Sequence, residues 1–466
     1  MTGPRVHAFT DDALGTHDAV SLAALVRNGE VTAEELASAA ADRARAVDPQ
    51  LNAVQLDLFD RPRIAGNRDA ALYGVPTFVK DNTDVRGLPT NNGSEAYQAP
   101  PAKHDGAYAR QFLATGVTLL GKSRLPEFGF NASTEYMTEP PVRNPWNTDH
   151  SVGASSGGSA ALVAAGVVPI AHANDGGGSI RIPAANAGLV GLKPSRHQHI
   201  DGEQASHLPI NMISEGVVSR TVRDTAAFLA AAEDHWRNPA IPPLGKVQGP
   251  ADRQLRVGLV LGTVNGAPID TETRAAVENT ARLLEKAGHV VEPMSLPVTD
   301  QFAEDFLQYW ALLADLACGT GKLILDRGFD KTRCDGLTLG LRDYHRSNLR
   351  RTPGALRRLR KISREHADMF GHVEVVLSPV LAHPAPELGY LSPTLPFETL
   401  IERLTEYVVF TPLNNIAGTP AISLPMAMAQ TGVPIGVQLS AGYGDERTLL
   451  ELAYTLEAEQ PFATIY

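Results

Sequence analysis

The segment at residues 159–168, SAALVAAGVV, constrains the fold most, because its residues are small and apolar on every side. A helix at a protein surface keeps a polar face, so a helix without one is buried in a core. Other elements must therefore cover this segment all round. The chain has 466 residues, 43% of them hydrophobic, which is enough material for such a core.

Strand-like and helix-like segments alternate along the rest of the chain. Residues 18–48 predict helices, and Thr32 followed by Glu35 forms a capping box at the start of one of them. Short apolar runs predict strands at residues 74–81, 116–123, 167–175, 255–262, 373–380 and 420–428. Helical stretches separate these strands, which is typical of an α/β protein.

A single large domain over residues 1–466 is expected, with N-terminal helices at about residues 10–60. The proline-rich stretch at residues 238–250 resembles a linker. Strand signals continue on both sides of it, however, so we interpret it as a surface connection within one domain.

Composition narrows the class of protein. The net charge of −11 argues against a nucleic-acid partner, because phosphate binding requires clustered Lys and Arg. Two cysteines, Cys318 and Cys334, are too few for a disulfide-stapled secreted protein. No signal sequence is visible, and the apolar stretches are shorter than the roughly 18 residues of a membrane span. These features predict a cytoplasmic protein that has no membrane association.

One segment departs from this acidic character. Residues 342–366 are strongly basic, which would suit a phosphate-bearing partner. We favour the simpler interpretation, a helix whose charged face meets solvent.

The glycine–serine stretch at residues 153–158 suggests several chemistries. Its glycine spacing matches a phosphate-binding loop, but such a loop continues with Lys, whereas Ser159 follows here. It also fits the G-x-S-x-G nucleophile elbow with Ser155 at the centre. That elbow needs a buried strand directly before it and a histidine base; the preceding residues favour turns, and nothing marks His372 or His383. An α/β-hydrolase-type esterase with Ser155 as nucleophile is the alternative reading.

Metal binding has little support. The sequence contains neither H-E-x-x-H nor paired C-x-x-C, and the HQH triplet at residues 197–199 supplies only two ligands on a loop, a pair that is usually solvated. We expect no metal and no other cofactor.

A second glycine–serine loop, NDGGGS at residues 174–179, is more informative. Three successive glycines let backbone N–H groups point into one small space, as an oxyanion hole requires. A serine attacks only after a base takes its proton. Lys80 ends an apolar strand-like segment, and burial there would lower its pKa and leave a neutral amine as the base.

Residues 153–184 together resemble the signature of the amidase signature family, without a gap. GVPTFVKDN around Lys80, and NIAGTPAISLP and GVPIGVQL near the C-terminus, are similar to other segments of that family. The resemblance implies an α/β fold with a large central mixed β-sheet flanked by helices on both faces. It is weakest at about residues 195–410, where we expect the variable, substrate-side region.

The family resemblance also implies a Ser–cis-Ser–Lys triad. Lys80 matches the base, Ser155 the relay serine that follows a cis peptide bond, and Ser179 the nucleophile. The oxyanion hole maps to the N–H groups of Gly176, Gly177, Gly178 and Ser179. Supporting roles fall to Ser156, Asp175 and Arg181, of which Asp175 is expected to anchor the loop by hydrogen bonds, and substrate contacts to Gly129, Phe130 and Asn131.

The implied activity is hydrolysis of linear amides, either aryl or alkyl, with carbamates, urethanes and esters as further substrates of the family. We expect a small-molecule substrate and a monomer or homodimer. One family branch is a subunit of an aminoacyl-tRNA amidotransferase, which is the other alternative. That branch usually has Gln where this chain has Ile182. Gly176 also stands where the family more often has Thr or Ile, which would either widen the pocket or loosen the loop.

Overall fold

The computed structural model describes residues 3–203, 205 and 208–466. Its centre is an eight-stranded sheet in the order β10-β9-β11-β13-β12-β7-β8-β6. The pairs β10–β9 and β9–β11 are parallel and the others antiparallel, so the sheet is mixed, as expected. Its strands are β6 (Ile170–Asp175), β7 (Val190–Lys193), β8 (Ser214–Ser219), β9 (Arg256–Leu259), β10 (Val290–Pro293), β11 (Val375–Pro379), β12 (Ala421–Met428) and β13 (Pro434–Ala441).

A three-stranded sheet in the order β1-β3-β2 adjoins this sheet, with β2 beside β6. It consists of β1 (Val54–Asp57), β2 (Pro76–Lys80) and β3 (Thr118–Ser123). A separate hairpin is formed by β4 (Arg143–Asn144) and β5 (Asn147–Ser151).

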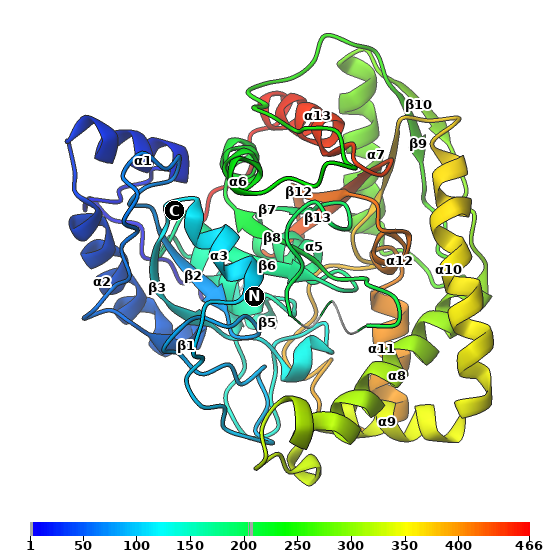
Figure 1. Cartoon of the computed structure of the whole chain (residues 1–466). Coiled ribbons are helices and arrows are strands. Elements are labelled where there is room, and N and C mark those ends of the chain that lie inside the picture. Colours follow the sequence, from blue (N-terminus) through cyan, green and yellow to red (C-terminus); the bar gives the residue numbers. More distant parts are fainter. Residues whose placement is uncertain (1–2, 204, 206–207) are drawn as a thin grey trace.

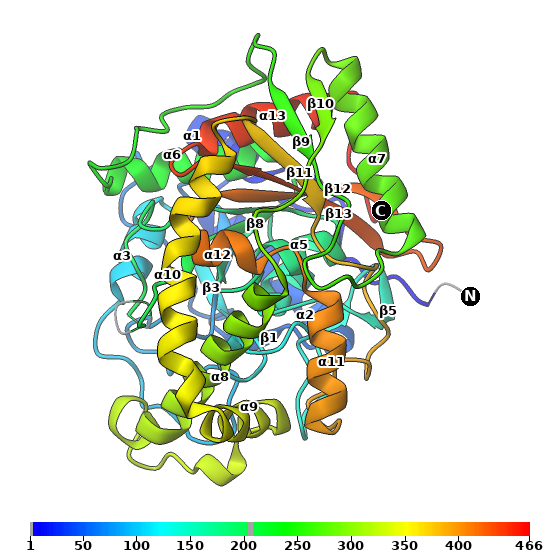
Figure 2. The same cartoon turned by 90° about the vertical axis from the view of Figure 1, so that its right-hand side faces the viewer.

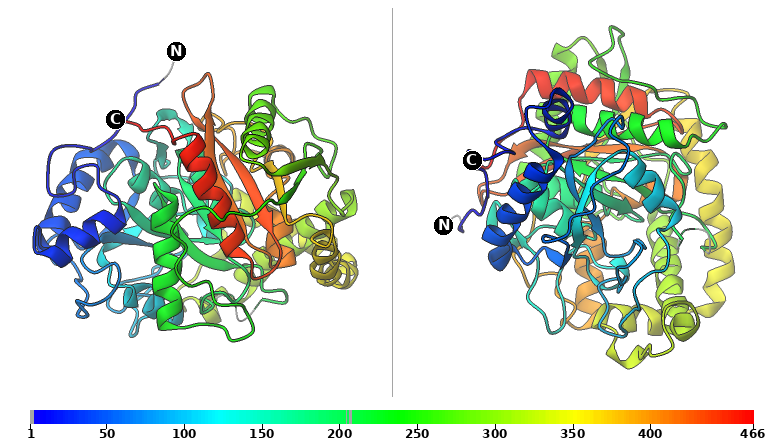
Figure 3. Two further views of the ribbon diagram at one scale, coloured as in Figure 1. Left: turned by 90° about the horizontal axis from the view of Figure 1, so that it is seen from above. Right: turned by 60° about the vertical axis from the view of Figure 1, so that its left-hand side comes forward.

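Helices cover both faces of the large sheet (Figure 1). The helices are α1 (Ala19–Asn28), α2 (Ala33–Leu51), α3 (Ala107–Ala114), α4 (Gly157–Ala164), α5 (Arg181–Ala187), α6 (Val222–His235), α7 (Thr271–Lys286), α8 (Asp300–Ile324), α9 (Gly336–Ser347), α10 (Thr352–Met369), α11 (Phe397–Tyr407), α12 (Pro412–Ala417) and α13 (Glu446–Glu459). Seen from above, α13 and α6 lie across one face of the sheet (Figure 3).

The alternation of side chains along β13 explains this layering. Ile435, Val437 and Leu439 share one apolar core with α6, α7 and α13. The intervening residues face α5, and at Gly436 an added Cβ would lie 2.4 Å from the Cβ of Ala185. Glycine therefore lets α5 pack directly on the strand, close to the loop that precedes it.

Local sequence signals account for several boundaries. The capping box at Thr32 and Glu35 is present at the start of α2. The expected strands appear at all six predicted places, each somewhat shorter than its apolar run. The helix predicted at residues 159–168 instead runs over Gly157–Ala164, because Gly166 takes a left-handed φ of 78° and ends it. All eight of its residues are buried, as its composition requires.

The residues before Ser155 were predicted to lack a strand, and that was wrong. They form the β4–β5 hairpin, because Asn144 and Asn147 pair across the turn. This hairpin does not belong to the large sheet, so it differs from the strand that precedes a nucleophile elbow.

Helices α8, α9, α10 and α11 gather beside the large sheet, where α10 runs along the outside of α8 (Figure 2). The basic segment forms the end of α9 and most of α10. One face of α10 is buried through Ala355, Leu359 and Ile362. Two of the segment's arginines pair with α8: Arg358 with Asp305, and Arg346 with Asp315. No described helix is both long enough and apolar enough to span a bilayer.

Candidate active site

Lys80 is the last residue of β2 and is completely buried. Its Nζ lies 2.7 Å from Ser155 Oγ, and it donates a hydrogen bond to Asn174 Oδ1, also at 2.7 Å. The structure therefore brings the predicted base and the predicted relay serine into direct contact. These residues lie 75 positions apart in the sequence.

Burial lowers the pKa of the Lys80 ammonium to about 7, although the negative charges of Glu215 and Asp175 act in the opposite direction. The backbone N–H of Lys80 donates to His172 Nδ1 at 3.2 Å. Since this nitrogen accepts, the Nε2–H of His172 donates to Glu215, at 2.9 Å. His172 thus holds the backbone of the lysine.

The loop that carries Ser155 packs closely against its neighbours. The peptide bond between Ala154 and Ser155 is cis, as the family resemblance implies. An added Cβ at Gly157 would lie 2.1 Å from Thr134 Oγ1, so glycine is required there. Gly129, with a φ of 70°, faces Ser155 from the other side, and a Cβ on it would lie 2.9 Å from the serine Oγ. Ser156 donates to the carbonyl of Asn174 at 3.3 Å and so links the two glycine–serine loops.

Asp175 anchors the second loop, as predicted. Its carboxylate accepts hydrogen bonds from the N–H groups of Gly178 and Ile180 and from the Arg181 guanidinium. The carboxylate and the guanidinium are both fully buried. Burial alone would raise the pKa of this carboxyl, but the charge and hydrogen bonds of Arg181 bring it well below its usual range. Arg181 also donates to Gln438 and to Asn415, both from the C-terminal part of the chain.

This anchoring corrects one predicted role. The Gly178 N–H donates to Asp175 Oδ1 at 2.7 Å, so it is not a free donor for an oxyanion. Gly178 serves a different purpose, because its φ of 133° suits only glycine. Gly176 and Gly177 line the cavity together with Ser179. A Cβ added at Gly176 would meet only Met212 and Ile213, at 3.6 Å or more, so its absence leaves space there.

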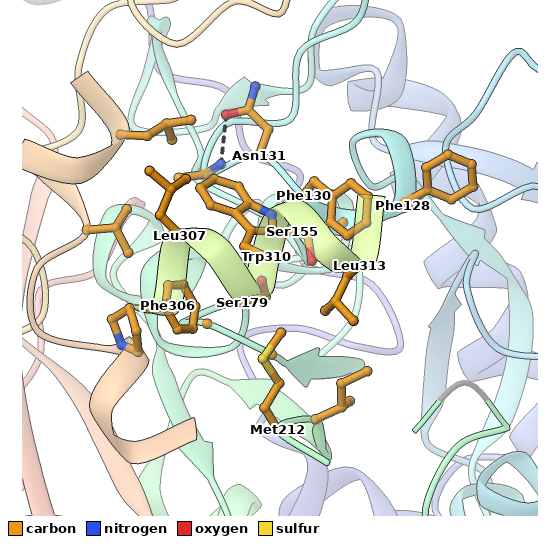
Figure 4. A pocket seen from close by; sticks show the side chains of 18 of the residues that line it. Phe128, Phe130, Asn131, Ser155, Ser179, Met212, Phe306, Leu307, Trp310 and Leu313 are labelled. Carbon is orange, nitrogen blue, oxygen red and sulfur yellow. Dashed lines mark hydrogen bonds between the residues drawn. The ribbon is translucent and has the colours of Figure 1, made fainter. Parts of the chain in front are cut away.

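A cavity of about 430 Å³ opens over these loops. Ser155 and Ser179 line it, as do the predicted substrate residues Gly129, Phe130 and Asn131. Figure 4 shows the two serines with Phe130 and Asn131. The Asn131 amide is used within the protein, since its Nδ2 donates to the Leu391 carbonyl at 2.8 Å.

Two parts of the site were missed by sequence reasoning. Asn174, the second partner of the Lys80 amine, directly precedes Asp175 in the NDGGGS loop, and only its position beside the glycines could have marked it. Helix α8 supplies a wall of the cavity through Phe306, Trp310 and Leu313 (Figure 4). The three- and four-residue spacing of these apolar side chains is visible in the sequence but also fits an ordinary core helix.

The alternative with Ser155 and a histidine base finds no support in the contacts. The Nδ1–H of His383 donates to the Pro384 carbonyl and its ring stacks on Tyr407, while His372 is exposed. Nor does the part of the chain that the structure describes contain a cluster of three or more His, Cys, Asp or Glu side chains suited to a metal ion.

Comparison with known proteins agrees with this geometry. A family model described as Amidase matches residues 35–450. The chain belongs to the Amidase family. "Putative amidase AmiC" of Mycobacterium leprae is 48% identical over 99% of this chain and 99% of that protein. The 6-aminohexanoate-cyclic-dimer hydrolase of Paenarthrobacter ureafaciens is 32% identical over 96% of this chain and 95% of that protein.

Solved structures extend the match to the fold. A structure of 6-aminohexanoate cyclic dimer hydrolase superposes on this amidase with a TM-score of 0.86 at 30% identity, covering 97% of this chain and 98% of the other. A bacterial aryl acylamidase of the amidase signature enzymes has the same fold, with a TM-score of 0.84 at 24% identity and 96% of both chains covered. This amidase is therefore a hydrolase of the amidase signature family that acts on amides.

Proposed function

We propose that this amidase hydrolyses linear amides through an acyl-enzyme on Ser179, with Ser155 and Lys80 as the proton relay. The observation that carries the proposal is the 2.7 Å approach of the buried Lys80 amine to Ser155 Oγ, at the base of a cavity that Ser179 also lines. A pKa of about 7 leaves a large fraction of this amine neutral near neutral pH.

The relay follows from these positions. Neutral Lys80 accepts the Ser155 proton while Asn174 Oδ1 holds one of its N–H groups. Ser155 in turn accepts the proton of Ser179, whose Oγ attacks the amide carbonyl carbon. The same path then delivers the proton to the leaving amine as the C–N bond breaks. Water next attacks the acyl-serine ester, and the relay runs once more to release the acid.

The developing oxyanion is assigned to the N–H groups of Gly176, Gly177 and Ser179, with Gly178 left out because Asp175 uses its N–H. Aryl and alkyl amides are the proposed substrates, and carbamates, urethanes and esters are candidates for side activity, because their carbonyls are open to the same attack.

Labelling with a sulfonyl fluoride, followed by peptide mass spectrometry, tests the nucleophile. We expect the adduct on Ser179 and none on Ser155. Ser179→Ala should also abolish release of 4-nitroaniline from acyl 4-nitroanilides. Ser347→Ala is the matched control, since Ser347 is exposed and does not line the cavity, and it should retain most activity. An adduct on Ser155 would contradict the assignment; absence of any turnover together with a co-purifying partner chain would favour an amidotransferase subunit.

A further inference from the structure

One face of α8 borders the cavity along most of the length of the helix. Phe306, Trp310, Leu313, Leu316, Thr320 and Ile324 line it at intervals of three and four residues, and we call this face the α8 groove. At 1.5 Å per residue, the groove is about 27 Å long from Phe306 to Ile324. It is an elongated site rather than a compact one.

The groove begins at the catalytic loops. A Cβ placed on Gly177 would lie 3.4 Å from Phe306 Cζ, so the first side chain of the groove touches the proposed oxyanion loop. Figure 4 shows Phe306 on one side of the two serines and Leu313, with Phe128, on the other. The Phe128 and Phe130 rings, with centroids 5.9 Å apart, also line the cavity.

The far end of the groove is apolar and open to solvent. Leu316 is 41% exposed and Ile324 is 62% exposed, although both line the cavity. An apolar chain can therefore extend from the serines along α8 toward the surface.

The described part of the cavity lining is uncharged. Among the described residues that border the cavity there is no Asp, Glu, Lys, Arg or His. The polar side chains are those of two serines, two threonines and four asparagines, most of them near the catalytic loops. Placing an ion against such a wall removes its hydration without any partner in exchange, which is costly.

We propose that the α8 groove selects uncharged amides that carry an extended apolar chain, with this chain lying along α8 from Phe306 toward Ile324. This inference rests on the proposed function and names its substrate class. Amides that carry an ammonium or carboxylate group within the groove are rejected.

A chain-length series tests the proposal. Rates are measured for acyl 4-nitroanilides from acetyl to dodecanoyl and, separately, for N-alkyl acetamides of the same chain lengths. In one of the two series we expect kcat/KM to rise about threefold per added methylene until the chain fills the groove. In the series that responds, replacing the terminal methyl of the six-carbon chain by a carboxylate (in the acyl series, hexanoyl by the adipoyl monoanilide) should lower kcat/KM about tenfold or more, because the carboxylate stays inside the groove. A flat response in both series, or equal rates for the charged analogue, would overturn the inference.

Two variants of α8 test where the apolar chain of the substrate lies. Leu316→Lys puts a cation on the groove, whereas Leu323→Lys is its matched control, since Leu323 is 88% exposed and does not line the cavity. We expect Leu316→Lys to raise kcat/KM about tenfold for at least one longer carboxylate-terminated anilide and to lower it for the uncharged one. Leu323→Lys should change neither. A gain of activity cannot arise from misfolding, and equal behaviour of the two variants would place the chain elsewhere.

Binding separates failure of this inference from failure of the proposed function. If no amide is hydrolysed, the proposed function fails. Dodecanoyl anilide and its carboxylate-terminated analogue are then titrated against Ser179→Ala protein, using fluorescence of Trp310 in the groove. Preferential binding of the uncharged chain supports the inference independently of turnover, and equal or absent binding overturns it.

Discussion

The two sides of the cavity are built on opposite principles. On the catalytic side, Lys80, Asp175 and Arg181 are buried, and each has named partners at hydrogen-bond distance. On the α8 side, Phe306 and Trp310 present apolar surface to the cavity. Buried polar groups depend on each partner, whereas apolar walls depend on volume and area. Substitutions should accordingly remove turnover or folding stability on the first side and change substrate preference on the second.

The largest expected effect is on turnover. Lys80→Met should lower kcat about 10⁴-fold, because no other basic side chain in the described part of the chain is hydrogen-bonded to Ser155 Oγ. Lys122→Met is the control: this lysine is equally buried but bonds to Asp81, Pro89 and Thr90 instead. It should lower stability while leaving kcat within about tenfold. Single-turnover kinetics on both folded variants checks this, and equal losses of kcat would contradict the comparison.

The next effect is on stability. Asp175→Asn should lower the free energy of unfolding by about 3–5 kcal/mol, since it leaves the buried Arg181 guanidinium without its counter-charge. Asp60→Asn, which breaks an exposed pair with Arg45, should cost about 0–1 kcal/mol. Urea unfolding measures both. A small loss for Asp175→Asn would mean that Gln438 and Asn415 suffice to hold the guanidinium.

A smaller effect on kcat/KM is expected from a change of pH. The active form of Lys80 is neutral, and burial places its pKa at about 7, so kcat/KM should fall about tenfold per pH unit below 7 and level off above it. The pH–rate profile of the wild-type enzyme checks this. An acid limb that is flat down to pH 5 would exclude the lysine as the base.

The smallest effect is expected on KM, from a substitution in the α8 wall of the cavity. Trp310→Ala should raise KM for an apolar anilide about tenfold and leave kcat nearly unchanged, because the indole contributes binding area and touches no relay group. Steady-state kinetics at saturating substrate separates the two constants. A fall in kcat without a change in KM would mean that the wall also positions the reacting carbonyl.

How much the sequence could predict differed between the catalytic side and the α8 side of the cavity. On the catalytic side, glycine and serine spacing marked both loops, because only glycine permits the close approach seen at Gly157 and the left-handed φ at Gly178. The strand that ends at Lys80 was likewise predicted and is confirmed. The role of Gly178 was not, because whether an N–H is free depends on where the Asp175 carboxylate points.

The wall could not be predicted. An apolar stripe at helical spacing has the same appearance whether it faces a core or a cavity, so α8 carried no signal of its own. The hydrogen-bond partners of Arg181 could not be predicted either, for a related reason. Gln438 of β13 and Asn415 of α12 lie more than 200 residues further along the chain, and only the tertiary packing brings them to Arg181.

By itself, the sequence determined the local elements: a buried helix of small residues, two glycine–serine loops, a strand that ends in a lysine, and the family to which they belong. Only the tertiary structure decided which groups meet. It brings the Lys80 amine next to Ser155 Oγ and pairs the Gly178 N–H with the Asp175 carboxylate. It also orients one face of α8 toward the cavity that the serines line. The physical reason is the sequence separation of the contacts involved. Backbone conformation follows from neighbouring residues, whereas burial, charge pairing and cavity shape arise from contacts between distant segments.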